Sequence, residues 1–394
     1  MSTAERMPVV FLAHAYPRFA GDPVGSFIHA LAVALRDEGI DVSVVAPAAE
    51  GVAARDVLDG IPVRRFRYAP RRWETLAYTG TMSAQVAHSW SGRIAMLGFL
   101  ASALSAVARE RRATGAALVH AHWWFPGGLV ARALHAMTKS LYVITLHGSD
   151  LRLALDSSWG RRLFRAVALH ASRITAVSAW LAQGAEEIAT GLDVVVAPMP
   201  VSTSLFEHAT ATREARRLLF VGKLAPQKGL DRLLRAMSRM HEPCTLTVVG
   251  AGRVDDTAFR TLARTLGLDD RIEWLPLLSQ ADLAGQYRRA AIHVIPALDE
   301  GLGLTAVEAQ LSETPVVAFA SGGMPDLMTD GATGLLVPAG DELALANALD
   351  GALNNDAQRQ ALGRAGRAAA LERFSPGIVA KGYAALYRDV AKQR

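Results

Sequence analysis

Residues 291–311 read AIHVIPALDEGLGLTAVEAQL, an apolar run, a glycine-containing loop and a helical stretch in direct succession. The apolar run ends at Pro296 and helix-forming residues resume at Leu304, which predicts a strand followed by a crossover helix. Glu300 then lies in the loop and Glu308 on the helix. Strand, loop and helix in this order form the repeating unit of parallel sheets.

The glycines before this helix are expected to leave its first backbone amides open to a ligand. Gly301 and Gly303 have no side chain, and the aligned amides of a first helical turn attract anions. A diphosphate suits such a position. The alternative is an ordinary crossover with a solvated carboxylate at each end, and this segment alone leaves both interpretations open.

Short β-branched runs alternate with helical stretches along the whole chain of 394 residues. This alternation predicts an α/β fold, and the length exceeds what one core normally supports. We expect two doubly wound parallel-sheet Rossmann-like domains facing across a cleft, with ligands beyond the carboxyl ends of the strands. The expected strands are Val9–Ala13, Val42–Ala46, Ala117–Ala121, Tyr142–Leu146, Ile174–Val177, Val194–Ala197, Arg217–Val221, Thr245–Gly250, Ile272–Trp274, Ile292–Pro296, Val316–Ala320 and Gly334–Val337.

The linker is predicted at 201–215, where Ser and Thr are scattered and no apolar period is visible. The N-terminal domain then covers 1–200, the C-terminal domain 216–375, and a last helix 376–394. The loop after the first strand lacks Gly-x-Gly-x-x-Gly, which argues against a nicotinamide enzyme of similar architecture.

The composition is that of a soluble globular protein, with 51% hydrophobic and 20% charged residues. A single cysteine, Cys244, excludes an intrachain disulfide and fits a reducing compartment, so a cytoplasmic location is expected. The N-terminus lacks the layout of a signal peptide. The longest mostly apolar uncharged run, 94–108, has 15 residues, short of the roughly 20 that span a bilayer, so no transmembrane helix is predicted.

The excess positive charge lies in the first half of the chain. Residues 1–200 contain 20 Lys and Arg against 15 Asp and Glu, whereas residues 201–394 contain 22 of each. Arginines cluster at 64–72, with aromatic residues between them, and again at 109–112. Two interpretations are open: a solvated basic edge beside a buried helix, or contact with a membrane surface, at the inner face of the membrane, or with an anionic acceptor. No nucleic-acid motif accompanies the cluster, so no nucleic-acid partner is expected.

Other side chains with chemical potential stand near the ends of expected strands. Lys223 and Lys228 follow the first strand of the second domain and could hold a pyrophosphate. His147 ends a strand of the first domain and could donate a hydrogen bond to a sugar hydroxyl, or simply cap the next helix. His120 and His122 alternate on one strand, but no third ligand stands at zinc-site spacing. There is no Asp-x-Asp, so neither a metal nor another cofactor is expected.

Taken together, these segments resemble the retaining nucleotide-sugar glycosyltransferases of GT-B fold, called group 1 or glycosyltransferase family 4. The resemblance covers nearly the whole chain. Its strongest element is the pair of glutamates separated by seven residues, together with Lys228 and His147. It runs through Gly21–Gly25, His120–Trp123, His147–Asp150, Ala176–Ser178, Gly222–Gly229, Glu300–Glu308, Gly322–Gly323 and Gly331–Pro338.

The resemblance implies a role for each of these residues. Glu308 would bind the ribose hydroxyls, and Glu300 and His147 the transferred sugar. Lys223 and Lys228 would stabilise the leaving diphosphate, the catalytic residues being His147, Glu300 and Lys228. The remaining donor contacts would be Gly25, Gly301, Gly303, Leu304 and Thr305. The last helix would cross back to the first domain, as it does in this fold.

Some positions depart from the family pattern. Lys223 stands where arginine is usual, which makes a phosphate contact monodentate. Asp326 replaces the common glutamate after the paired glycines, and Pro198–Val201 replaces Asn-Gly-Val-Asp. Leu302 replaces the usual phenylalanine, apolar for apolar.

The resemblance implies transfer of a hexosyl-type group from a nucleoside diphosphate sugar to an acceptor hydroxyl, with retention at the anomeric carbon and without a metal. The acceptor, a glycan, a lipid-linked sugar or a small molecule, is left open, as are the base and the sugar. Two alternatives remain: a sugar-nucleotide epimerase of the same fold, and a non-catalytic nucleotide-sugar-binding protein.

Overall fold

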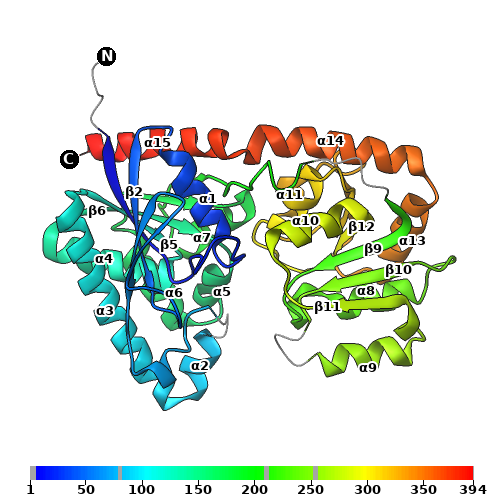
Figure 1. The fold of residues 1–394 in the computed structure, drawn as a ribbon, viewed down its shortest axis with the longest axis horizontal. Coiled ribbons are helices and arrows are strands. Elements are labelled where there is room, and N and C mark those ends of the chain that lie inside the picture. Colours follow the sequence, from blue (N-terminus) through cyan, green and yellow to red (C-terminus); the bar gives the residue numbers. More distant parts are fainter. Residues whose placement is uncertain (1–5, 79–81, 208–212, 252–255, 394) are drawn as a thin grey trace. The chain divides into compact units, whose positions relative to one another are not determined.

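The computed structural model describes residues 6–78, 82–207, 213–251 and 256–393, and the chain divides into two compact units (Figure 1). Unit 1 comprises Met1–Pro200 together with Pro376–Arg394, and unit 2 comprises Val201–Ser375. Residues 208–212 of the predicted linker lie outside the described residues, and the first strand of unit 2 already begins at Glu214.

Unit 1 contains an eight-stranded sheet in the order β3-β4-β2-β1-β5-β6-β7-β8. All neighbouring strands are parallel except β3 and β4, which form an antiparallel hairpin at one edge. The strands are β1 (Met7–Leu12), β2 (Ile40–Pro47), β3 (Arg55–Leu58), β4 (Ile61–Phe66), β5 (Leu118–His122), β6 (Leu141–Leu146), β7 (Arg173–Ala176) and β8 (Val194–Val196).

Helices enclose this sheet, as Figure 1 shows. They are α1 (Ser26–Leu35), η1 (Arg71–Trp73), α2 (Met82–His88), α3 (Trp90–Thr114), η2 (Trp124–Gly128), α4 (Leu129–Thr138), α5 (Ser149–Leu155), α6 (Ser158–Ala168), α7 (Ala179–Ile188) and α15 (Pro376–Lys392). Helix α15, the last segment of the chain, packs beside α1, and its Tyr387 hydroxyl lies 2.6 Å from Nδ1 of His120 on β5.

Helix α3 is longer than the apolar run at residues 94–108 that lies within it. It has 25 residues, because helical structure continues through Arg93 on one side and through Arg109–Arg112 on the other. By length and composition alone it could cross a membrane, because an 18-residue window within it has a mean hydropathy of 1.4. The core helix of a soluble protein passes the same test, and α3 packs against β1, β2 and β4.

Unit 2 contains a six-stranded parallel sheet in the order β11-β10-β9-β12-β13-β14. The strands are β9 (Glu214–Val221), β10 (Thr245–Val249), β11 (Ile272–Leu275), β12 (Ala290–Ile295), β13 (Val316–Phe319) and β14 (Leu335–Val337). The helices are η3 (Pro226–Lys228), α8 (Leu230–Met237), α9 (Thr257–Thr265), η4 (Asp269–Arg271), α10 (Gln280–Arg289), α11 (Leu304–Leu311), α12 (Met324–Leu327), α13 (Glu342–Leu353) and α14 (Asp356–Phe374).

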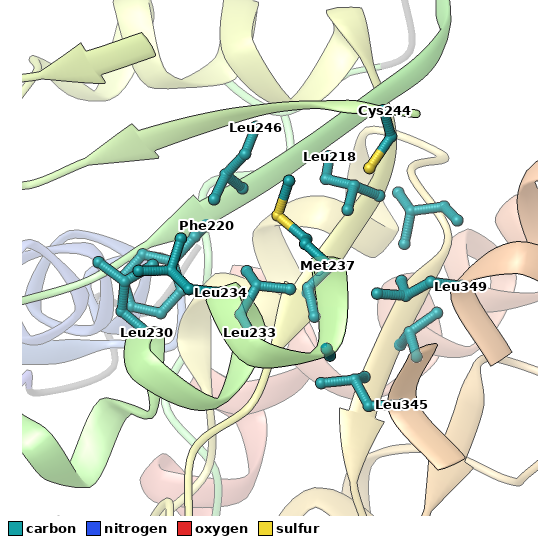
Figure 2. Packing of buried hydrophobic residues seen from close by; sticks show 14 of the residues in the cluster. Leu218, Phe220, Leu230, Leu233, Leu234, Met237, Cys244, Leu246, Leu345 and Leu349 are labelled. Atoms are coloured by element: carbon teal, nitrogen blue, oxygen red, sulfur yellow. The ribbon is translucent and has the colours of Figure 1, made fainter. Parts of the chain in front are cut away.

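One core of unit 2 lies between the sheet and helices α8 and α13. Figure 2 shows Leu230, Leu233 and Leu234 of α8 packed toward Phe220 of β9 and Leu246 of β10. These side chains are almost completely excluded from solvent. Leu218, Leu219 and Phe220 are consecutive buried residues of β9, so this strand buries apolar side chains on both faces of the sheet, as parallel strands do.

The predicted fold class is confirmed: both units are α/β structures built on mainly parallel sheets. The sequence prediction missed the hairpin formed by β3 and β4, whose arginines were interpreted only as a charge cluster. The hairpin turns at Asp59 and Gly60, both at positive φ (46° and 78°), as a two-residue Asp-Gly hairpin turn requires.

Candidate functional site

The strand order of unit 2 reverses between β9 and β12. From β9 the chain adds β10 and β11 on one side, then returns to add β12, β13 and β14 on the other. The loops that follow β9, β12 and β13 therefore leave neighbouring strands at the same carboxyl edge. In open α/β sheets this switch point is where ligands bind.

The loops after β9 and β12 are joined by an ion pair. Lys228 at the end of η3 places Nζ 2.5 Å from Oε2 of Glu300, and both side chains are only partly exposed. The amide of Leu298 also donates to the carbonyl of Gln227 (3.3 Å). An ammonium has three donors, so Lys228 retains capacity for an anion while paired with Glu300.

Glycine is required where these loops pack most closely. Gly229 has φ +73°, and a Cβ there would lie 1.9 Å from the carbonyl oxygen of Pro296. Gly303 has φ +81°, and a Cβ would lie 2.2 Å from Cε of Met324. Both residues precede helices, α8 and α11. A side chain at Gly229 would push the β9 and β12 loops apart, whereas one at Gly303 would meet the flexible end of Met324.

Helix α11 opens at Gly303 on this edge. Among the residues that the structure describes, no acceptor is found for the amides of Leu304 and Thr305, whereas the amide of Ala306 donates to the carbonyl of Gly303 (2.8 Å). Gly301 is buried in the loop before the helix. Two unbonded amides at the start of an eight-residue helix form a position where a phosphate oxygen could be held.

Glu308 lies one turn further along α11 and has an unusual environment. Its Oε2 accepts a hydrogen bond of 2.8 Å from the hydroxyl of Tyr287 on α10. The carboxylate retains some exposed surface, but protein atoms surround it closely, and this desolvation raises its pKa to about 7 despite the hydrogen bond from Tyr287. A carboxyl poised near neutral pH is a common property of binding and catalytic sites.

His147 occupies the equivalent carboxyl edge of unit 1, directly after β6. Its amide and that of Gly148 donate to Oδ1 of Asp150 (3.1 and 3.0 Å), and the amide of Trp124 donates to Oδ2 (3.1 Å). The ring of His147 lies 4.5 Å from that of Trp123, centroid to centroid. Asp150 therefore fixes the backbone that carries His147.

His147 is held in its neutral form. Desolvation lowers its pKa well below 6.5, and its Nε2 lies 3.2 Å from Nδ1 of His122. The pKa of His122 is also well below the normal value, again chiefly through burial. A neutral imidazole can donate one hydrogen bond and accept another, which suits a neutral hydroxyl ligand.

The two histidines of β5 share one face of the sheet, with ring centroids 4.2 Å apart. His120 is bound to two hydroxyls, Tyr387 at Nδ1 (2.6 Å) and Thr145 at Nε2 (2.7 Å). Within the described ranges, no three His, Cys, Asp or Glu side chains are grouped closely enough to hold a metal ion.

Two further positions of unit 1 have local explanations. Gly25 precedes α1 at φ +72°, and a Cβ there would lie 2.5 Å from the carbonyl oxygen of Ala15. The loop after β1 thus requires glycine whether or not a phosphate approaches it. Ser178 accepts a hydrogen bond from the amide of Leu181 (3.3 Å) and is the N-cap of α7, as its position after β7 indicated.

The predicted site residues accordingly fall into three sets. Lys228 and Glu300 are in contact, and Gly301, Gly303, Leu304, Thr305 and Glu308 belong to the same loop and helix. Lys223 is exposed in the loop between β9 and η3. His147 and Gly25 belong to unit 1 and are described there alone.

Two residues that contact the predicted site residues, Asp150 and Tyr287, were not themselves predicted as part of the site. Asp150 was within reach of sequence reasoning, because an aspartate in the loop directly after a strand commonly accepts from loop amides. Tyr287 lies within a helix and gave no local signal, because its contact with Glu308 is created by the packing of α10 on α11.

The fold places this chain among proteins built of two Rossmann-like domains, the GT-B class. A sucrose-phosphate synthase from Thermosynechococcus elongatus superposes with a TM-score of 0.83 at 21% identity, covering 99% of this chain and all of that one. Anabaena HepE in complex with UDP-glucose superposes with a TM-score of 0.75 at 18% identity, covering 98% and 100%.

Family models then identify the class more narrowly. A model described as Glycosyltransferase Family 4 matches residues 24–205, and one described as glycosyl transferases group 1 matches residues 203–369. The chain belongs to the group 1, family 4 glycosyltransferases, as the resemblance predicted. A D-inositol 3-phosphate glycosyltransferase from Corynebacterium kroppenstedtii is 36% identical over 221 residues; the match spans 51% of this chain and only about half, 49%, of that relative.

Proposed function

We propose that this chain transfers a sugar from a nucleoside diphosphate donor to an acceptor hydroxyl, with retention at the anomeric carbon and without a metal ion. The observation that supports it best is the 2.5 Å pair of Lys228 and Glu300 beside the open amides of α11. A cation and helix amides suit a diphosphate, and a carboxylate beside them suits sugar hydroxyls. Family membership supports the same assignment.

Different residues of unit 2 would bind different parts of the donor. Glu308 on α11 would accept from the ribose hydroxyls, the amides of Leu304 and Thr305 would hold phosphate oxygens, and Glu300 would bind the transferred sugar. Lys228 and Lys223 would offset the charge that develops on the leaving diphosphate. From unit 1, His147 would contact the sugar and Gly25 would approach the phosphates.

In the proposed reaction the bond between the anomeric carbon and the diphosphate oxygen breaks, and a bond to the acceptor oxygen forms on the same face. The acceptor proton passes to an oxygen of the departing diphosphate. Glu300 has no nucleophilic part, so the route differs from that of a retaining glycosidase, which forms a glycosyl-enzyme intermediate. Exclusion of water from the site would suppress donor hydrolysis.

The test begins with the donor. A thermal-shift panel of nucleoside diphosphates and their sugars identifies the base, because a ligand that binds the native state raises its stability. UDP-glucose is the first candidate, since HepE was solved with it. A phosphorylated polyol is the first acceptor to try, given the named activity of the Corynebacterium relative.

The product then decides between the alternatives. We expect a retained anomeric configuration by NMR, and activity that survives a metal chelator; an inverted linkage would overturn the assignment. Incubation with donor alone separates the epimerase, which would return an isomeric sugar or sugar nucleotide. Nucleotide-sugar binding without turnover of any acceptor would favour a binding protein.

A further inference from the structure

The outward face of helix α3 in unit 1 is apolar where a surface helix is normally polar. Trp90, Ile94 and Leu97 are 77%, 53% and 70% exposed. Their spacing of four and three residues places them on one side of the helix, and exposed Ala101 continues the row. Single exposed apolar residues are normal, but a row of three large ones marks an interaction surface.

The opposite face of α3 is occupied by the sheet. Ala95, Met96, Phe99 and Val107 are buried, and the helix packs against β1, β2 and β4. The exposed row is therefore not a core face that happens to be uncovered at one end. The helix lies along the sheet, and its apolar outer side faces away from it.

A basic pocket of about 410 Å³ adjoins the same helix. It is lined by Ala101, Ser105 and Arg109 of α3 and by arginines of the β3–β4 hairpin. Arg55 stands directly opposite Arg64 in the hairpin register. Arg64 is paired with Glu110 (2.5 Å), whereas no such pair is found for Arg55 within the described residues, so Arg55 and Arg109 are the charges of this pocket that remain for an anion.

The charge of this region has little internal compensation. Residues 55–149 contain twelve Lys and Arg but only four acidic residues, Asp56, Asp59, Glu74 and Glu110. Each glutamate is already paired, Glu110 with Arg64 (2.5 Å) and Glu74 with Arg67 (2.8 Å). In the part of the chain that the structure describes, no carboxylate pairs with Arg93, which follows Trp90, or with Arg55 and Arg109 of the pocket.

We propose that this face of unit 1, formed by the outer side of α3 and the arginine pocket beside it, docks on the surface of membranes that contain anionic phospholipids. Trp90, Ile94 and Leu97 enter the boundary between headgroups and acyl chains, and the arginines contact lipid phosphates. Arg93 lies 5.1 Å from the centre of the Trp90 ring, so a positive charge accompanies the aromatic anchor.

The combination of features selects a membrane over other anions. A nucleic acid or a soluble phosphate would use the arginines but would leave the apolar row in water. A lipid surface satisfies both at once, because phosphates and hydrocarbon lie within a few ångströms of each other at the interface. The docking is independent of the transfer reaction proposed for unit 2, since it involves none of its residues.

The experiment is sedimentation of the full chain with vesicles of phosphatidylcholine alone and of an equal mixture with phosphatidylglycerol. We expect binding to the mixed vesicles on the order of tenfold tighter than to the neutral ones, since each arginine near an anionic surface adds to the attraction. High salt should weaken the binding several-fold through screening. Equal binding to both vesicles, or none to either, overturns the proposal.

Matched variants test the surface itself. Trp90→Ser with Leu97→Ser should weaken binding to mixed vesicles by about tenfold, as should Arg55→Ser with Arg109→Ser. Leu343→Ser is the control, because Leu343 on α13 of unit 2 is also exposed (55%) but follows two acidic residues, Asp341 and Glu342. Circular dichroism checks that each variant is folded. An equal loss of vesicle binding in the control variant overturns the proposal. It is also overturned if the Trp90 and Leu97 variant binds vesicles as well as the unaltered chain does and inorganic phosphate abolishes that binding.

Discussion

At the scale of single residues, the environment of Glu308 makes a pH dependence predictable. Its pKa of about 7 means that the carboxyl is half protonated near neutrality, and only the ionised form can accept from two ribose hydroxyls. Donor affinity should therefore rise by about tenfold between pH 6 and pH 8. Calorimetric titration with a sugar nucleotide measures this, since its diphosphate diester does not titrate in that range. Glu308→Gln should bind more weakly and without the pH dependence; a retained dependence would assign it to another group.

Tyr287 offers a second measurement on the same carboxyl. Its hydrogen bond lowers the pKa of Glu308, partly opposing desolvation. Tyr287→Phe keeps the ring that packs on Phe206 and His293 but removes the donor. The midpoint of the pH dependence of donor affinity should then move upward. An unchanged midpoint in a folded variant would show that the hydroxyl does not act on Glu308.

Substitution of Lys228, which pairs with Glu300, should affect turnover far more than stability. A half-exposed ion pair stabilises a fold by at most about 1 kcal/mol. Removal of a charge that stabilises a transition state typically lowers kcat by about 10²–10³-fold. Lys228→Met should accordingly leave the thermal midpoint nearly unchanged while reducing turnover in that range. Arg232→Met is the matched control, because Arg232 is a nearby, partly exposed cation whose side chain donates to the carbonyl of Pro226 and, within the described residues, forms no ion pair. Equal loss of turnover in both variants would contradict a specific role for Lys228.

At the scale of elements, the glycine-bearing loops of unit 2 predict a graded series. Gly267 has φ +68° with open space around it, so Gly267→Ala should cost only the left-handed backbone strain, about 1–2 kcal/mol. Gly229→Ala adds a clash with the carbonyl of Pro296 and should cost the most. Gly303→Ala meets the flexible end of Met324 and should fall between them. Urea unfolding gives the order, and a Gly229 variant as stable as the Gly267 variant would contradict the packing argument.

The same scale shows what the sequence predicts and what it omits. All six strands of unit 2 were predicted, because each contains a short run of β-branched or other apolar residues between helical stretches. The β3–β4 hairpin was missed, since Arg55, Arg64 and Arg65 conceal the alternation, although Asp59-Gly60 was a readable turn signal. Glu300, Glu308 and Lys228 were found through local motifs. The partnership of Tyr287 with Glu308 depends on how two helices pack, which no local pattern encodes.

At the scale of the whole molecule, acid should act unequally on the two units. Five buried histidines have pKa values lowered by desolvation: His14 to about 4, His120 to about 3, His293 to about 4, and His122 and His147 well below 6.5. Such groups bind protons on unfolding, so their contribution to stability is present above pH 6.5 and is lost as the pH falls. Below pH 6.5 and above its own lowered pKa, each histidine reduces the free energy of unfolding by about 1.4 kcal/mol for every unit that the pH falls.

Four of these histidines belong to unit 1 and only His293 to unit 2. In unit 1 a single group, Asp150, acts in the opposite direction, because burial raises its pKa. In unit 2 the raised pKa of Glu308 stabilises the folded state as the pH falls below 7 and offsets His293. Between pH 7 and pH 5.5, calorimetry should therefore show one unfolding transition moving to lower temperature while the other stays nearly constant. Addition of a nucleoside diphosphate identifies the nearly constant transition as that of unit 2, because a ligand bound to unit 2 raises the temperature of its unfolding. If the transition that responds to nucleotide were the acid-sensitive one, the assignment of the histidine effect to unit 1 would be wrong.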